Sequence, residues 1–177
     1  MTDRKNRIIP IIAILLMTAA LFCGCSKKQE IEPRTAGFSC KAQVHCSGTE
    51  FTCDLMIGEN GTASAKITEP SSLKGLSCSY NGDKMTLSYL GIKKEIDPSQ
   101  YTEFGYFSEV RRILLSVPEN AEAAVKNGAY TYEGECSAGS YTIEFRADGF
   151  PVKVTLPSED LTVTFSDFEY YNAASAN

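Results

Sequence analysis

The sequence predicts a mainly β protein: a curled antiparallel meander or half-open barrel of about nine or ten strands, with one or two short helices in its concavity. Three observations support this prediction. From residue 37 onward apolar and polar residues alternate with a period of two, which is typical of half-buried strands. Turn signals separate the alternating runs at short intervals. Helical periodicity is confined to one stretch between residues 108 and 128.

The alternating runs place apolar residues on one face of each expected strand. Over residues 38–46, for example, Phe38, Ala42 and Val44 occupy every second position and polar residues fill the gaps. The same alternation recurs over residues 51–57, 141–146, 152–156 and 161–165. Each run therefore predicts a strand with one buried and one solvent-exposed face.

The turns test this pattern, because facing residues of a hairpin lie on the same side of the sheet. We therefore expect each turn to pair apolar with apolar residues. The expected pairs are Val44 with Phe51, Ala42 with Cys53, Ile57 with Ala63, Leu55 with Ala65, Cys78 with Met85, Leu76 with Leu87, Cys136 with Tyr141, Tyr132 with Phe145, Phe145 with Val152, Ile143 with Val154, Leu156 with Leu161 and Val154 with Val163. Most junctions thus agree on a single apolar face, which favours a real fold.

The one helical signal follows Ser108, which we expect to cap a helix. Its apolar residues recur at helical spacing, at Val110, Ile113, Leu114 and Val117. Pro118 stops or restarts that helix, and Asn127-Gly128 is expected to end a second short, Ala-rich helix.

So little helix cannot cover the sheet. Nine strands at about 4.8 Å spacing make a sheet roughly 43 Å wide, whereas a helix is about 10–12 Å across. The sheet must therefore curl, and its interior is either solid or a cavity for one small apolar ligand. The residues expected to line such a cavity are Leu55, Ile57, Tyr80, Leu87, Tyr89, Tyr130, Tyr132, Tyr141, Ile143, Phe145, Val154 and Val163.

The first 24 residues have the layout of a signal peptide. A basic start is followed by an apolar run from Ile8 to Cys23, shorter than the about 20 residues of a bilayer span. Gly24 before Cys25 resembles the bacterial lipobox, so Cys25 is the expected site of lipid attachment, with Cys23 a weaker rival after bulky Phe22. The alternative is a short anchor that is never cleaved.

This reading divides the chain into four segments. Residues 1–24 form the signal peptide, 25–36 the lipidated cysteine and a flexible polar tether, 37–170 the folded domain and 171–177 a disordered tail. The protein is then expected at the cell membrane, lipid-anchored on its extracytoplasmic face.

Five cysteines follow Cys25, so at most two disulfides form and one thiol stays free. They are Cys40, Cys46, Cys53, Cys78 and Cys136, and all fall in the apolar phase of their strands. Buried small hydrophobes are the favoured interpretation, and disulfides the alternative outside the cytoplasm. No set of four ligands has zinc-site spacing, so no metal and no cofactor are expected.

Composition and motifs argue against catalysis and nucleic acid binding. The formal charge is −5 and no basic run stands out, which disfavours nucleic acid as a partner. The chain lacks a Gly-rich phosphate loop and a Gly-x-Ser-x-Gly elbow, and His45 has no nucleophile partner in its phase of the strand. Glu133 and Glu135 lie on the solvent phase as ordinary solvated carboxylates. We therefore expect a protein that is not an enzyme.

Several segments resemble the LolA-type lipoprotein-carrier superfamily, in the style of short Firmicutes lipoproteins. They are residues 67–76 (ITEPSSLKGL), 81–84 (NGDK), 148–152 (DGFPV) and 161–166 (LTVTFS). The resemblance implies a half-open antiparallel barrel with helices in the concavity, where carrier members bind acyl chains. The long N-terminal helix of typical carriers is missing from this sequence.

Two functions follow from the sequence and the resemblance. The leading hypothesis is a membrane-anchored lipoprotein that binds or carries a lipid or acyl chain in an apolar concavity. The alternative is a non-catalytic interaction module with a solid interior that recruits a cell-envelope enzyme or transporter. The interior discriminates between them, since an apolar void of about 300–1,000 Å³ supports a ligand and a close-packed interior supports the module.

Overall fold

The computed structural model describes residues 28–82, 84–97, 105–126 and 128–170. The expected signal peptide, Cys25 and the expected C-terminal tail lie outside these residues. The elements are β1 (Lys28–Ile31), β2 (Phe38–Cys46), β3 (Thr49–Ile57), β4 (Ala63–Glu69), β5 (Ser77–Tyr80), β6 (Met85–Tyr89), β7 (Ile92–Ile96), α2 (Gly105–Ser116), β8 (Ala121–Lys126), β9 (Ala129–Cys136), β10 (Gly139–Phe145), β11 (Pro151–Leu156), the 3-10 turn η3 (Pro157–Glu159) and β12 (Leu161–Tyr170).

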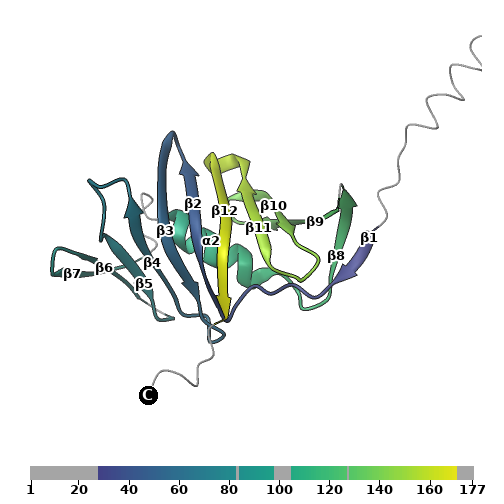
Figure 1. Ribbon diagram of the computed structural model, residues 1–177, viewed down its shortest axis with the longest axis horizontal. Coiled ribbons are helices and arrows are strands. Elements are labelled where there is room, and N and C mark those ends of the chain that lie inside the picture. Colours follow the sequence, from purple (N-terminus) through teal and green to yellow (C-terminus); the bar gives the residue numbers. More distant parts are fainter. Residues whose placement is uncertain (1–27, 83, 98–104, 127, 171–177) are drawn as a thin grey trace, which may run out of the picture.

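The strands form a single antiparallel sheet in the order β1-β8-β9-β10-β11-β12-β2-β3-β4-β5-β6-β7. The mainly β class and the antiparallel meander are confirmed. The sheet is not closed into a barrel, because β1 and β7 lie at its two ends and pair with different neighbours. Figure 1 shows these two strands at opposite ends of the long axis, with α2 behind the central strands.

The sheet has 12 strands rather than the expected nine or ten. One extra strand is β8, Ala121–Lys126, where the sequence favoured a second helix. That expectation is wrong because β8 pairs with both β1 and β9 and buries Ala121 and Ala123. Burial between two strands outweighs the helix propensity of alanine, which is worth only tenths of a kcal/mol per residue.

Another extra strand is β1, within the segment expected to be a flexible tether. Lys28 to Ile31 pair with β8 over four register positions, and Lys28 Nζ lies 3.6 Å from Glu122 Oε2. The chain then crosses the end of the sheet, where the Arg34 backbone N–H donates to the Gly149 carbonyl at 2.8 Å. The sheet therefore includes residues that precede the expected domain boundary at residue 37 by up to nine positions.

The register of the central hairpins follows the turn analysis. The confirmed pairs are Val44 with Phe51, Ala42 with Cys53, Ile57 with Ala63, Leu55 with Ala65, Ile143 with Val154, Leu156 with Leu161 and Val154 with Val163. All of these residues are buried, so the predicted apolar face is the face that forms the core.

Two hairpins pair two residues away from the prediction. Cys78 faces Leu87, not Met85, because the loop is closed by backbone hydrogen bonding between Asn81 and Lys84 and is longer than Asn81-Gly82. Leu76 therefore does not face Leu87. A slip of two residues leaves every side chain on its original face, which is why the apolar pattern could not detect it.

The β9–β10 hairpin shows the same slip. Tyr141 faces Gly134, not Cys136, and Tyr132 faces Ile143, not Phe145. Steric crowding explains the glycine opposite the Tyr141 ring, since a Cβ on Gly134 would overlap the Tyr141 side chain. At β10–β11 a register shift after Glu144 sets Phe145 against Pro151 in place of Val152.

Helix α2 fills the concave side of the sheet. It starts at Gly105, so Ser108 lies inside it and is not its N-cap, and the Ser108 hydroxyl is buried without a partner among the described residues. The predicted apolar residues Val110, Ile113 and Leu114 are buried against the sheet, and the helix ends at Ser116 just before Pro118. None of the helices in the described part of the chain is long and apolar enough to cross a membrane.

Candidate functional site

The residues expected to line a ligand cavity all belong to the concave face, but they differ in burial. Seven are buried in the core: Leu55, Ile57, Tyr141, Ile143, Phe145, Val154 and Val163. Four are half-buried and pack against that core: Tyr80, Leu87, Tyr130 and Tyr132. Tyr89 is 37% exposed. The five residues that are not fully buried all lie on β5, β6 and β9, away from the central strands.

The space between α2 and the central strands is nearly filled. The crevice there has a volume of only about 20 Å³. It is lined by Ala42, Val44, Cys53, Leu55, Ala65, Tyr106, Phe107, Val110 and Val163. A space of this size holds about one water molecule, so this crevice has no room for an acyl chain while α2 stays in place.

The cysteines of the folded domain are free thiols in this structure. Cys40, Cys53 and Cys78 are buried, and Cys46 and Cys136 are half-buried. Burial raises the pKa of each of the three buried thiols to about 12, with smaller contributions from Cys53 on Cys40 and from Asp54 on Cys53. Protonated thiols are poor nucleophiles, so these three act as small apolar core residues.

The imidazole of His45 lies between two carboxylates at the β2–β3 end of the sheet. Its Nδ1 is 3.4 Å from Glu50 Oε1 and its Nε2 is 3.8 Å from Asp160 Oδ2. All three side chains lie at the surface, 43% exposed for His45 and 69% exposed for each carboxylate. Among the described residues, His, Cys, Asp and Glu side chains do not gather in threes as a metal site.

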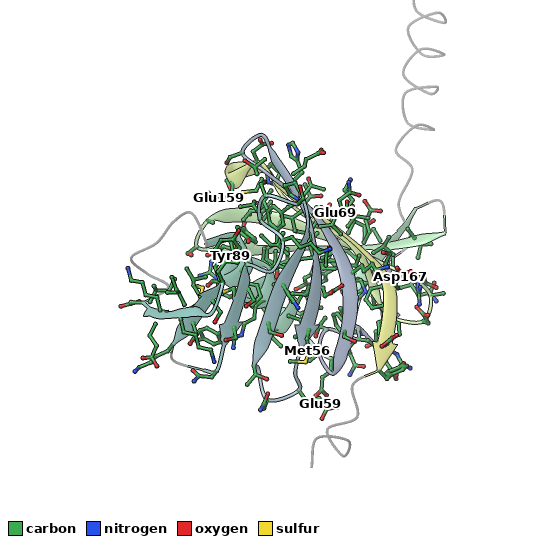
Figure 2. The ribbon with its side chains drawn as sticks, turned by 60° about the vertical axis from the view of Figure 1, so that its left-hand side comes forward. Met56, Glu59, Glu69, Tyr89, Glu159 and Asp167 are labelled. Carbon is green, nitrogen blue, oxygen red and sulfur yellow. The ribbon has the colours of Figure 1, made fainter. Side chains whose placement is uncertain are left out.

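An open hollow lies on the opposite, convex face. We call it the convex groove, a space of about 500 Å³ across β12, β2, β3 and β4. It is lined by Ser39, Cys40, Lys41, Asp54, Leu55, Met56, Ser64, Lys66, Asp167 and Glu169. Figure 2 shows Met56 on β3 and Asp167 on β12.

Charges alternate across the convex groove. Lys41 faces Asp54, and Asp54 faces Lys66, in successive antiparallel registers. On the other side of β2, Lys41 Nζ lies 3.1 Å from Asp167 Oδ2, and this contact raises the pKa of Lys41. The result is a row of four side chains, Asp167, Lys41, Asp54 and Lys66, that runs perpendicular to the strands.

A β-bulge positions one end of this row. The register between β12 and β2 shifts between Ser166 and Glu169, and Asp167 has a left-handed backbone with φ of 51°. A bulge redirects a side chain that an ordinary strand would place elsewhere. The sequence analysis did not single out this row, because polar residues on the exposed phase look like ordinary solvated positions. Only the cross-strand registers and the bulge bring the four charges together.

Similar proteins are found by structure rather than by sequence. The chain matches a LolA superfamily protein from Nitrosomonas europaea with a TM-score of 0.50 at 12% identity, covering 80% of this chain and 89% of that one. The fold is LolA-like. The carrier-like half-barrel predicted from the turn motifs is thereby confirmed as a fold.

Two further solved structures match this chain with lower TM-scores. One belongs to the complex of the CwlD amidase from Clostridioides difficile with the GerS lipoprotein, at a TM-score of 0.46 and 19% identity, covering 76% of this chain and 86% of the other. A DUF1329 family protein from Desulfovibrio piger has a TM-score of 0.38 at 12% identity, covering 79% of this chain and 90% of the other. No protein-family model and no curated protein matches the sequence.

Proposed function

We propose that this protein is a non-catalytic lipoprotein, anchored through Cys25 on the extracytoplasmic face of the cell membrane, whose LolA-like sheet binds a cell-envelope protein. One observation favours the interaction module over the carrier, the two functions predicted from the sequence. The concave side is filled by α2 down to about 20 Å³, whereas the convex face has an open, charged groove of about 500 Å³. A solid interior with a polar outer hollow suits a binding module better than a carrier.

The anchor is supported by the first 25 residues. A basic start, a short apolar run and Gly24-Cys25 are the layout of a lipoprotein precursor. Labelling the full chain in cells with radioactive palmitate tests this directly. We expect label on the wild type and on Cys23→Ser, and none on Cys25→Ser. Label that persists in Cys25→Ser refutes the assigned attachment site.

The convex groove supports a protein partner through its charges. Lys41 and Asp167 are both more than half exposed, so each keeps hydrogen-bonding capacity for a partner. A row that alternates in sign selects a partner whose charges alternate in the opposite order, and mismatched partners are repelled. Such interfaces gain specificity more than raw affinity from their charges.

The test places a photo-cross-linking amino acid at Met56, inside the convex groove, and at Glu135, on the convex face of β9, as the matched control. We expect one dominant cross-linked envelope protein from position 56 and not from position 135. Exchanging the ion pair, with Lys41→Asp combined with Asp167→Lys, keeps that ion pair but sets an aspartate at position 41 against Asp54, so the row no longer alternates and that cross-link should be abolished. Equal cross-linking from both positions would contradict a partner site in the groove.

Acyl-chain binding remains the second candidate, favoured by the half-buried Tyr130 and Tyr132 on the concave face beyond α2. On this reading α2 must leave the sheet to admit a chain. Native mass spectrometry of protein taken from the membrane fraction, followed by titration with a fluorescent fatty acid, tests it. Co-purified lipid, and fatty-acid binding that is lost in Val110→Trp, would support a carrier. If neither lipid nor fatty acid binds, the carrier hypothesis fails.

A further inference from the structure

The turn between β6 and β7 exposes the largest apolar side chains at this end of the sheet. Leu90 is 83% exposed and Ile92 is 74% exposed. Tyr89, which faces Ile92 across the hairpin, is 37% exposed and is labelled in Figure 2. Two aliphatic side chains and a tyrosine thus project together from one hairpin, which we call the β6–β7 tip.

The backbone gives no reason for a leucine at this tip. Tyr89 and Ile92 close a two-residue turn in which Leu90 has φ of 50° and Gly91 has φ of 83°. Such turns favour Asn or Asp at the first position, because a branched side chain is disfavoured in the left-handed region. Leu90 therefore occupies an unfavourable conformation without being buried. Strain kept at an exposed position points to a role outside folding.

The charge around the tip is the opposite of the charge of the chain. Lys93 and Lys94 follow Ile92, and Lys74 lies in the β4–β5 loop, which Tyr89 reaches by donating its hydroxyl to the Ser72 carbonyl at 3.2 Å. Residues 70–75 and 88–94 contain no Asp or Glu, although the chain as a whole has a formal charge of −5. The carboxylates that border these two segments are Glu69 and Glu95, and Glu95 is paired with Lys84 at 2.8 Å.

We propose that the β6–β7 tip contacts an anionic lipid bilayer, with Leu90 and Ile92 inserted at the boundary of the acyl chains and Lys74 and Lys93 among the phosphate headgroups. This combination of aliphatic side chains, an interfacial tyrosine and flanking lysines suits a membrane surface. Basic residues next to a bilayer are attracted by its anionic lipids. A protein partner with a rigid pocket for Leu90 would not require the lysines around the tip.

This contact also orients the domain. The chain enters the sheet at β1, and the tip connects β6 with β7, which ends the sheet on the other side. Together with the Cys25 anchor of the proposed function, on which this orientation rests, two contacts at opposite ends lay the long axis of the sheet along the bilayer. The anchor keeps the bilayer at high effective concentration, so a weak contact at the tip is sufficient.

The absence of tryptophan from the chain allows a direct test. The full chain carrying Leu90→Trp as its one tryptophan is reconstituted into vesicles of phosphatidylcholine and phosphatidylglycerol that contain brominated lipid. Tyr170→Trp, at a residue that is 64% exposed at the end of β12, is the matched control. We expect a blue shift and strong bromine quenching for the Leu90→Trp reporter and little of either for the control.

Further measurements separate the contributions of the lysines, of the anionic lipid and of the Cys25 anchor to this quenching. Adding Lys74→Glu and Lys93→Glu to the Leu90→Trp chain should reduce the quenching, and so should omitting phosphatidylglycerol. Quenching of the Leu90→Trp reporter in the Cys25→Ser background shows that the tip contact holds even if acylation fails, which separates this inference from the proposed anchor. Quenching no stronger than that of Tyr170→Trp overturns the inference, as does a cross-link from position 90 to a protein in place of lipid.

Discussion

The contact between Gly134 and Tyr141 gives a prediction that tests the register of β9 on β10. Gly134→Ala adds a Cβ that would fall 2.9 Å from Tyr141 Cε2, and closer still to Cζ and the hydroxyl oxygen. Tyr141 is 3% exposed and its hydroxyl lies 2.8 Å from Ser116 Oγ at the end of α2. The ring cannot move without losing this link between sheet and helix.

The magnitude follows from three contributions. Overpacking a buried site costs about 1–3 kcal/mol, and losing the hydrogen bond to Ser116 costs about 0.5–1.5 kcal/mol. Replacing a glycine in a strand by alanine stabilises the folded state by about 0.5–1 kcal/mol. We therefore expect Gly134→Ala to lower the free energy of unfolding by about 0.5–4 kcal/mol, with the steric cost as the largest contribution.

Urea unfolding of the purified protein measures this change as a shift in midpoint at constant m-value. Gly105→Ala is the matched control, because nothing lies within 4 Å of a Cβ added at the start of α2. It should leave stability unchanged or raise it by up to about 1 kcal/mol. In a double-mutant cycle, Tyr141→Leu should relieve part of the cost of Gly134→Ala. A Gly134→Ala protein as stable as the wild type would refute the observed pairing and restore the predicted pairing of Tyr141 with Cys136.

Three further predictions concern the rest of the sheet. Leu90→Asn should raise the free energy of unfolding by about 1 kcal/mol, and with it the urea midpoint, because asparagine tolerates the left-handed turn position. An unchanged midpoint would show that Leu90 is not strained. Cys40, Cys53 and Cys78 should resist a thiol reagent at pH 8 until the protein unfolds, whereas the half-buried cysteines should react first. The pKa of each of the three buried thiols is raised to about 12 from 9.0. The folded state therefore holds more protons than the unfolded state, and stability should fall as pH rises above 9. Arg34→Ala should destabilise the protein by about 0.5–2 kcal/mol, since the guanidinium lies 5.5 Å from the Phe150 ring centroid and 5.2 Å from that of Tyr170.

Much of the fold could be predicted because one-sided burial imposes a period of two on each strand. The pairing of Val44 with Phe51 and of Val154 with Val163 followed from turn chemistry together with that period. Where the prediction missed, at Cys78 and Tyr141, the slip was two residues and kept the same face. Hydrophobic patterning cannot detect a slip of two residues. The register is decided by loop closure at Cys78 and by side-chain volume at Tyr141.

The convex groove could not be predicted, because the features that form it leave no pattern in neighbouring residues of the sequence. Lys41, Asp54, Lys66 and Asp167 are distant in the sequence and form one row only through three strand registers and a bulge. The strands β1 and β8 were missed for a related reason. Lys28–Ile31 is polar and Ala121–Lys126 is Ala-rich, and each becomes a strand by pairing with the other.

The sequence by itself determined the antiparallel meander, its apolar face and the apolar side of the helix that covers it, because each is a property of neighbouring residues and their spacing. Only the tertiary structure decided that α2 seats closely enough on β2, β3 and β12 to leave almost no interior space, and that the convex face carries the large hollow. The reason is physical: spacing fixes which side of a strand is buried, but the volume left between two packed surfaces depends on how side chains from distant segments interlock.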